Sequence, residues 1–123
     1  MKKLYLLALP VFALCFFFSC KHEPILPPNE VSYHDDILPI VRNSCQHAGC
    51  HDPNDPNAEF PLDSIVSEVL EYVDPGKPKD SEIYERITET DPDEIMPRPP
   101  YEPLTARQIN LIYIWIGQGA KDN

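Results

Sequence analysis

This sequence of 123 residues is poor in glycine, methionine, tryptophan and positive charge. It contains four glycines, two methionines and one tryptophan, and its 20 acidic side chains outnumber the 10 basic ones. The resulting net charge of −10 repels phosphate backbones, so we expect no nucleic acid partner. Beyond the N-terminus long apolar stretches are few, and we find no internal repeat and no hairpin signal.

The N-terminus has the pattern of an export signal. Two early lysines precede an apolar run over residues 4–18, which is too short for a spanning helix. Ser19 then precedes Cys20, and a small residue before a cysteine is typical of the lipobox of bacterial lipoproteins. We therefore predict a signal peptide at residues 1–19 and lipidation of Cys20. Ordinary cleavage that leaves Cys20 as a free thiol is the alternative.

The predicted mature chain has two parts. Residues 20–31 are rich in proline and mixed in charge, which is typical of a semi-extended tether, and residues 32–123 form one small domain. After the signal, 20 acidic and eight basic side chains remain, a net charge of −12. We expect an exported protein, lipid-anchored to a bacterial membrane (the outer membrane in preference), that faces the periplasm or the cell exterior. Basic protein surfaces are its expected partners.

The domain shows helical patterns only. A first helix begins at Ser32 and a last helix follows Thr105, and each of these residues has an Asp or Gln capping partner three positions later. Pro39 distorts or shortens the first helix. Apolar residues at helical spacing predict two more helices, over about 63–72 and 81–88. The expected fold is all-α, with about four short helices and long proline-rich loops.

Residues 45–51, Cys-Gln-His-Ala-Gly-Cys-His, are the most informative stretch. The usual signature for c-type haem attachment is C-x-x-C-H, whereas four residues separate the cysteines here. The other two cysteines lie in the signal and at the lipid site, which leaves Cys45 and Cys50. This pair could attach one haem c, and His51 directly behind it could offer an imidazole to the iron. In an exported protein the same pair could instead form a disulfide. A bound cofactor would also help a domain near the lower size limit for a core.

Met96 is the favoured second axial ligand. Methionine, histidine or an open position are the ordinary options opposite an imidazole. Met96 is the only methionine left after the signal, and three prolines stiffen its loop. A lone methionine usually fills a gap in a core, but with the cysteine motif upstream we favour the ligand. The other histidines are weaker candidates, because His22 and His34 are expected in solvent and His47 lies inside the attachment loop.

Several short motifs resemble a known family, the small class I-like cytochrome c domains of bacterial lipoproteins, including planctomycete-type cytochrome c relatives. The resemblance covers residues 33–120. Its motifs are Asp36-Ile37-Leu38-Pro39-Ile40, residues 45–51, Pro75-Gly76-Lys77-Pro78, Met96-Pro97, Leu104-Thr105 and Trp115-Ile116-Gly117-Gln118-Gly119-Ala120. The resemblance implies a fold in which the first and last helices pack against each other beside the haem. It also implies thioethers at Cys45 and Cys50, with His51 as the proximal and Met96 as the distal ligand.

Three kinds of function remain open. The leading hypothesis is a membrane-anchored c-type cytochrome that passes single electrons between redox partner proteins and is not an enzyme. A haem enzyme would need an open axial site, and so a Met96 that does not bind iron. A haem-free secreted lipoprotein with a binding or structural role would have a Cys45–Cys50 disulfide, or a zinc site completed by His47 and His51.

Overall fold

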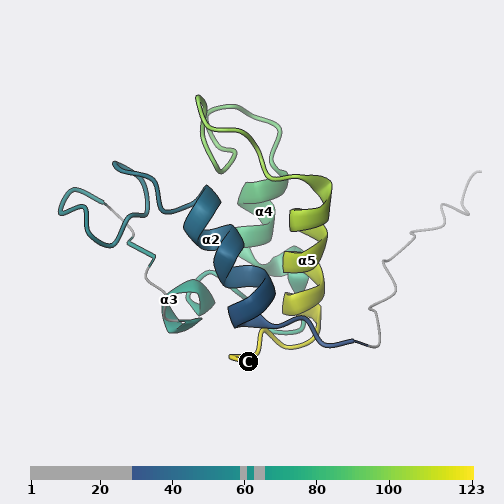
Figure 1. Cartoon of the computed structure of the whole chain (residues 1–123). Helices are drawn as coiled ribbons and strands as arrows, with labels where there is room; N and C mark the ends of the chain where they lie inside the picture. The colour runs from purple at the N-terminus through teal and green to yellow at the C-terminus, as the bar shows by residue number, and fades with distance from the viewer. Residues whose placement is uncertain (1–28, 59–60, 63–65) are drawn as a thin grey trace, which may run out of the picture.

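A computed structural model describes residues 29–58, 61–62 and 66–123, and all regular elements in these ranges are helical (Figure 1). The elements are a π-helix η2 (Tyr33–Ile37), helices α2 (Leu38–Ser44) and α3 (Val66–Leu70), a 3-10 turn η3 (Pro78–Asp80), and helices α4 (Glu82–Thr88) and α5 (Ala106–Gly117). The predicted all-α fold of short helices and long loops is confirmed. The predicted signal peptide and Cys20 lie outside the described residues. In the part of the chain that the structure describes, we find no helix with the length and apolar character needed to cross a bilayer.

The first helix opens with a wide π turn and continues as α2. The hydroxyl of Ser32 accepts a 3.1 Å hydrogen bond from the N–H of Asp35, and the N–H of Ser32 donates a 3.0 Å bond to the carboxylate of Asp36. Pro39 lies in the first turn of α2. Because proline has no N–H and its ring needs room beside the carbonyl four residues earlier, a wider turn before it is favoured. The Ser32 cap and the distortion at Pro39 are present as predicted, but the carboxylate that accepts from the Ser32 N–H is that of Asp36 and not the predicted Asp35.

Helix α5 is the longest of the described helices and begins as predicted. The side chain of Gln108 accepts a 2.8 Å hydrogen bond from the N–H of Thr105, and the Thr105 hydroxyl accepts a 3.3 Å bond from the N–H of Gln108. The helix ends at Gly117, and Gly119 then adopts a φ of +103°. That conformation is open to glycine, which lacks a Cβ.

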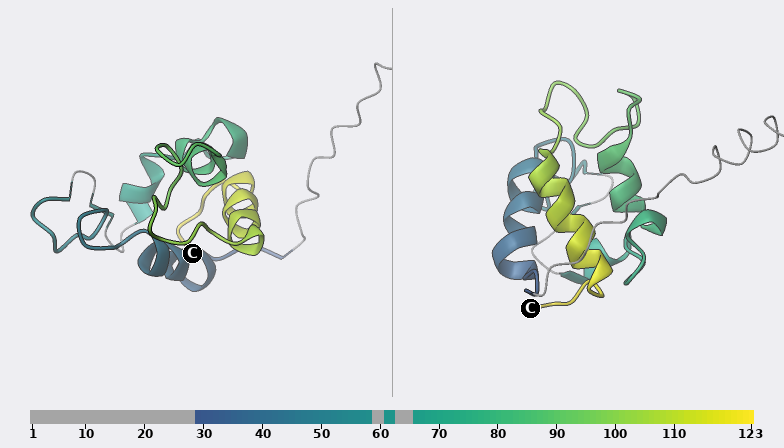
Figure 2. Two further views of the ribbon diagram at one scale, coloured as in Figure 1. Left: turned by 90° about the horizontal axis from the view of Figure 1, so that it is seen from above. Right: turned by 90° about the vertical axis from the view of Figure 1, so that its right-hand side faces the viewer.

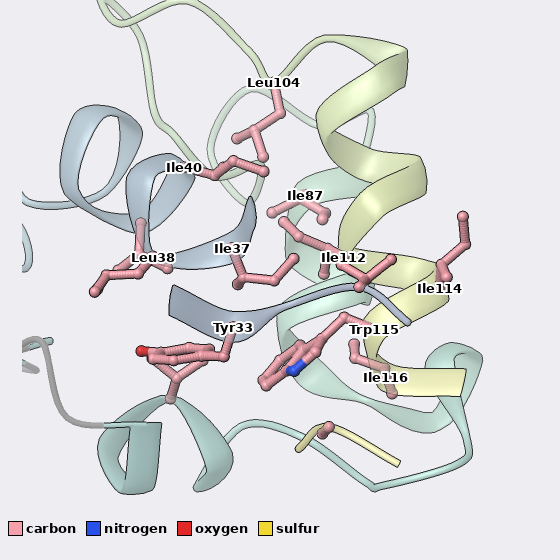
Figure 3. Close-up of a cluster of buried hydrophobic side chains, with 14 of the residues drawn as sticks. Tyr33, Ile37, Leu38, Ile40, Ile87, Leu104, Ile112, Ile114, Trp115 and Ile116 are labelled. Carbon is pink, nitrogen blue, oxygen red and sulfur yellow. The ribbon is translucent and has the colours of Figure 1, made fainter. Parts of the chain in front are cut away.

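The first helix and α5 pack against each other around an aromatic pair. The ring of Tyr33 lies 5.4 Å from that of Trp115, and 1% or less of each residue is exposed (Figure 3). Ile37, Ile112 and Ile116 fill the space around them. The helix packing that the resemblance implied is therefore confirmed.

The C-terminus is tied to the start of the first helix. The backbone carbonyl of Asn123 accepts a 2.7 Å hydrogen bond from the Ser32 hydroxyl, and its side chain accepts a 2.8 Å bond from the N–H of Tyr33. Val31 is buried, and its N–H donates to the side chain of Gln118. The C-terminus therefore lies at the other end of the molecule from the loop of residues 89–105 (Figures 1 and 2).

Helix α4 confirms the helix predicted over residues 81–88, and α3 lies within the one predicted over 63–72. Residues 63–65 are outside the described ranges. A buried residue, Ser81, holds the turn before α4: its hydroxyl donates to the carbonyl of Lys77 and accepts from the N–H of Asp74, each at 2.9 Å. This turn fixes the point at which α4 begins.

Candidate functional site

A cavity of about 770 Å³ brings together the four haem-site residues that the sequence predicted. Cys45, Cys50, His51 and Met96 all line it. Its walls are mainly apolar, and they include Leu62, Val69, Ile83, Ile87 and Pro97. The volume is within the range of about 300–1,000 Å³ that is common for small-molecule and cofactor sites.

The attachment loop, residues 45–51, follows α2 directly and is folded by short backbone bonds. The N–H of Cys45 donates to the carbonyl of Val41 at the end of the helix, at 2.9 Å. Within the loop, the N–H of His47 donates to the carbonyl of Cys45 and the N–H of Cys50 to that of His47, both at 2.9 Å. These bonds fix the backbone of both cysteines relative to α2.

The second half of the loop is fixed by residues that follow it. Gly49 has a φ of +78°, and its N–H donates a 2.7 Å hydrogen bond to the carboxylate of Asp55. The backbone N–H groups of Asn57 and Gly49 hold the pKa of Asp55 below its usual value. The carbonyl of His51 accepts a 3.0 Å bond from the N–H of Leu62. Asp55 and Leu62 thus hold the loop that presents His51.

Cys45 and Cys50 are free thiols, and both are partly buried. Burial, with a smaller contribution from the neighbouring Cys50, raises the pKa of Cys45 to about 11. Since the thiolate is the reactive form of cysteine, the surroundings of Cys45 protect the thiol from unwanted reactions near neutral pH. Among the described residues, no three His, Cys, Asp or Glu side chains gather to hold a metal ion.

Met96 enters the cavity from the loop between α4 and α5. Its N–H donates a 2.9 Å hydrogen bond to the carbonyl of Arg86, near the end of α4. Pro97 is buried directly after it, and the N–H of Tyr101 donates a 3.1 Å bond to the carbonyl of Arg98. The stiff, proline-rich loop expected from the sequence thus carries a partly buried thioether at the cavity wall.

Several residues that line the cavity were not assigned a site role by the sequence, among them two arginines and a tyrosine. Arg86, Arg98 and Tyr101 all line it. The guanidinium of Arg86 lies 3.7 Å from the Glu82 carboxylate and 3.3 Å from that of Glu94. No local pattern marks these residues: Arg86 reaches the cavity from α4, and Arg98 and Tyr101 reach it through the folding of the loop between α4 and α5.

His47 also lines the cavity, and its ring stacks on that of Tyr101. The two centroids are 4.0 Å apart and the planes differ by 2°. The sequence placed His47 on the attachment loop but indicated no contact for it. The stack joins this loop to the one that carries Met96.

The donor set and the walls of this cavity fit a haem c. Cys45 and Cys50 offer two thiols for thioether attachment, and His51 and Met96 offer the nitrogen and sulfur donors that are common in cytochromes c. Apolar walls suit a flat, largely hydrophobic macrocycle.

Comparison with known proteins agrees with this fit. Residues 48–100 match the family described as Planctomycete cytochrome C. The matched segment includes Cys50, His51 and Met96, and Cys45 lies three residues before it. No curated protein and no solved structure matches the chain. The planctomycete-type resemblance predicted from the sequence is confirmed over this segment.

Proposed function

We propose that the protein is a one-electron carrier with one covalently bound haem c, since residues 48–100 match the family described as Planctomycete cytochrome C. The observation that carries this proposal is one cavity lined by Cys45, Cys50, His51 and Met96. Haem bound there supplies an iron that changes between the ferrous and ferric states. The protein residues hold that group and control what reaches it.

Each of the four proposed haem-site residues has a distinct role. Cys45 and Cys50 hold the cofactor through thioethers, while His51 supplies an imidazole nitrogen and Met96 a thioether sulfur to the iron. A thioether ligand favours the ferrous state and raises the reduction potential. Buried side chains such as Val69 and Ile87 exclude water from the site, which limits the solvent reorganisation that accompanies a change of charge.

Ligation by both His51 and Met96 would favour a carrier over an enzyme. A substrate such as a peroxide would need an open iron position, and in this proposal the Met96 thioether would occupy it. The backbone bond from Met96 to Arg86 and the buried Pro97 both support a fixed thioether. The open-site enzyme is the second candidate, and its distinguishing property is the binding of carbon monoxide.

The N-terminal signal supports an anchored carrier. In this proposal Cys20 carries the lipid, and residues 20–31 link it to the domain. The outer membrane is the favoured location of the anchor. In the described chain, Glu30 forms a 2.6 Å ion pair with Lys121. The tether therefore joins the domain near the C-terminus, away from the loop of Met96 (Figure 1). The strongly acidic chain is suited to redox partners with basic docking surfaces.

The test is a visible absorption spectrum of the mature chain, expressed in a host that has haem-attachment machinery. We expect sharp bands in the reduced protein, and colour that stays with the polypeptide after denaturation. Lack of a carbon monoxide response in the reduced protein would support the carrier over the open-site enzyme. A colourless protein from that host would overturn the proposal.

A further inference from the structure

The four-residue spacer between the cysteines contains a residue that contacts the opposite loop. The His47 and Tyr101 rings are parallel within 2°, with their centroids 4.0 Å apart, and both line the cavity. Stacked aromatic pairs contribute attraction beyond the area that they bury. The stack is thus a specific contact between the attachment loop and the loop that carries Met96.

The His47 side of this contact is tied to both cysteines. Its N–H donates to the carbonyl of Cys45, and its carbonyl accepts from the N–H of Cys50. The second bond closes the turn over residues 47–50, for which a two-residue spacer has no room. The ring of His47 is therefore held by the same backbone bonds that shape the attachment loop.

The Tyr101 side of the contact belongs to a loop that is fixed mainly at its ends. The N–H of Met96 donates to the carbonyl of Arg86 at one end, and buried Leu104 packs into the core at the other. Between them, a turn closed by the N–H of Tyr101 and the carbonyl of Arg98 places the tyrosine ring against His47. The stack thus holds the middle of this loop over the cavity.

From this geometry we infer that His47 and Tyr101 form a clamp that keeps the Met96 loop closed over the cavity, and so stabilises Met96 as an iron ligand. This inference rests on the proposed function. Both are positioning residues, because neither supplies a ligand. The clamp also explains the longer spacer between the cysteines, because the spacer carries the His47 ring that contacts the opposite loop.

The clamp can be tested by competition between Met96 and added imidazole for the ferric iron. We expect His47→Ala and Tyr101→Ala each to raise the apparent affinity for imidazole about two- to ten-fold, the range that a stacked pair supplies. The double variant should gain no more than either single variant, because all three lose the same contact. Tyr101→Phe keeps the ring, so it should bind imidazole as the wild type does.

His34→Ala is the matched control, because it removes an exposed histidine that pairs with Asp122 away from the cavity. It should leave the imidazole affinity unchanged. Tyr101 is 38% exposed and His47 is partly exposed, so both truncations leave the buried core in place. The far-red absorption band of methionine-bound ferric haem gives a second readout, which should weaken in both alanine variants.

The possible failures are distinct. A wild-type protein without bound haem, or without the methionine band, would overturn the proposed function and the clamp together. If the wild type shows the band but the alanine variants bind imidazole with the wild-type affinity, the clamp alone is overturned. Fully additive effects of the two truncations would also contradict a shared contact.

Discussion

The backbone N–H of Met96 donates a 2.9 Å hydrogen bond to the carbonyl of Arg86, and so joins the loop of the proposed distal ligand to helix α4. The same helix supplies Ile83 and Ile87 to the cavity wall. Since α4 packs against α5, the position of Met96 depends on the packing of these two helices. The ligand is therefore positioned by the fold as well as by its own stiff loop.

Met96→Leu tests the distal ligand while nearly conserving volume. We expect the reduction potential to fall by on the order of 0.1 V, since axial ligands tune haem potentials over about 0.8 V and a thioether favours ferrous iron. The open position should also bind carbon monoxide. A redox titration and a carbon monoxide spectrum measure the two effects. Ile83→Leu, a similar change in the cavity wall, should produce neither, and an unchanged potential in Met96→Leu would argue against ligation.

The first and last helices of the domain could be predicted because the sequence patterns that begin them are local. The caps at Ser32 and Thr105 depend on residues within about one helical turn, and both form, although Asp36 takes the part expected of Asp35. Pro39 acts on the turn that contains it. The grouping of Cys45 to His51 with Met96 came from motif chemistry and from the resemblance, and the cavity brings these residues together.

The remainder of the site depends on contacts that no local pattern encodes. The stack between His47 and Tyr101 joins two loops that are distant in sequence, and neither loop has a periodicity. Arg86 reaches the cavity although it belongs to a helix that was predicted only from its apolar face. Such contacts result from how the loops fold over the helices, so the sequence alone did not indicate them.

Cys45→Ala and Cys50→Ala test how the cofactor is attached. Each single variant leaves one thiol and should keep haem through a single thioether, whereas the double variant should lose haem in denaturant. Mass spectrometry of the denatured proteins measures this retention. Cys50 lies inside the family match and Cys45 just before it, so the two single variants also show whether both cysteines bind. Retention of haem by the double variant would contradict thioether attachment.

The chain without attached haem should lose stability at alkaline pH because of Cys45. Burial, with a smaller contribution from Cys50, raises the pKa of Cys45 from 9.0 to about 11, so the folded state holds this proton more tightly than the unfolded state does. The stabilising contribution, on the order of 2 kcal/mol, is complete below about pH 9 and is lost as the pH rises to about 11.

Urea denaturation of the haem-free chain between pH 8 and 11 measures this loss. Cys45→Ala should remove this contribution to the pH dependence of stability. The haem-bound protein should not show it either, because its thiols have been converted to thioethers, which do not titrate. A haem-free Cys45→Ala variant with the same alkaline loss as the haem-free wild type would show that another group is responsible.

Ser81→Ala tests the turn that positions α4. The Ser81 residue is 1% exposed, and its hydroxyl bonds both the carbonyl of Lys77 and the N–H of Asp74 at 2.9 Å. Its removal leaves these two groups without the hydroxyl partner, which costs about 1–3 kcal/mol of unfolding free energy. Chemical denaturation measures the loss, and Ser67→Ala on the exposed side of α3 should change stability by less than about 0.5 kcal/mol. Equal stabilities of the two variants would mean that α4 is positioned by its apolar contacts alone.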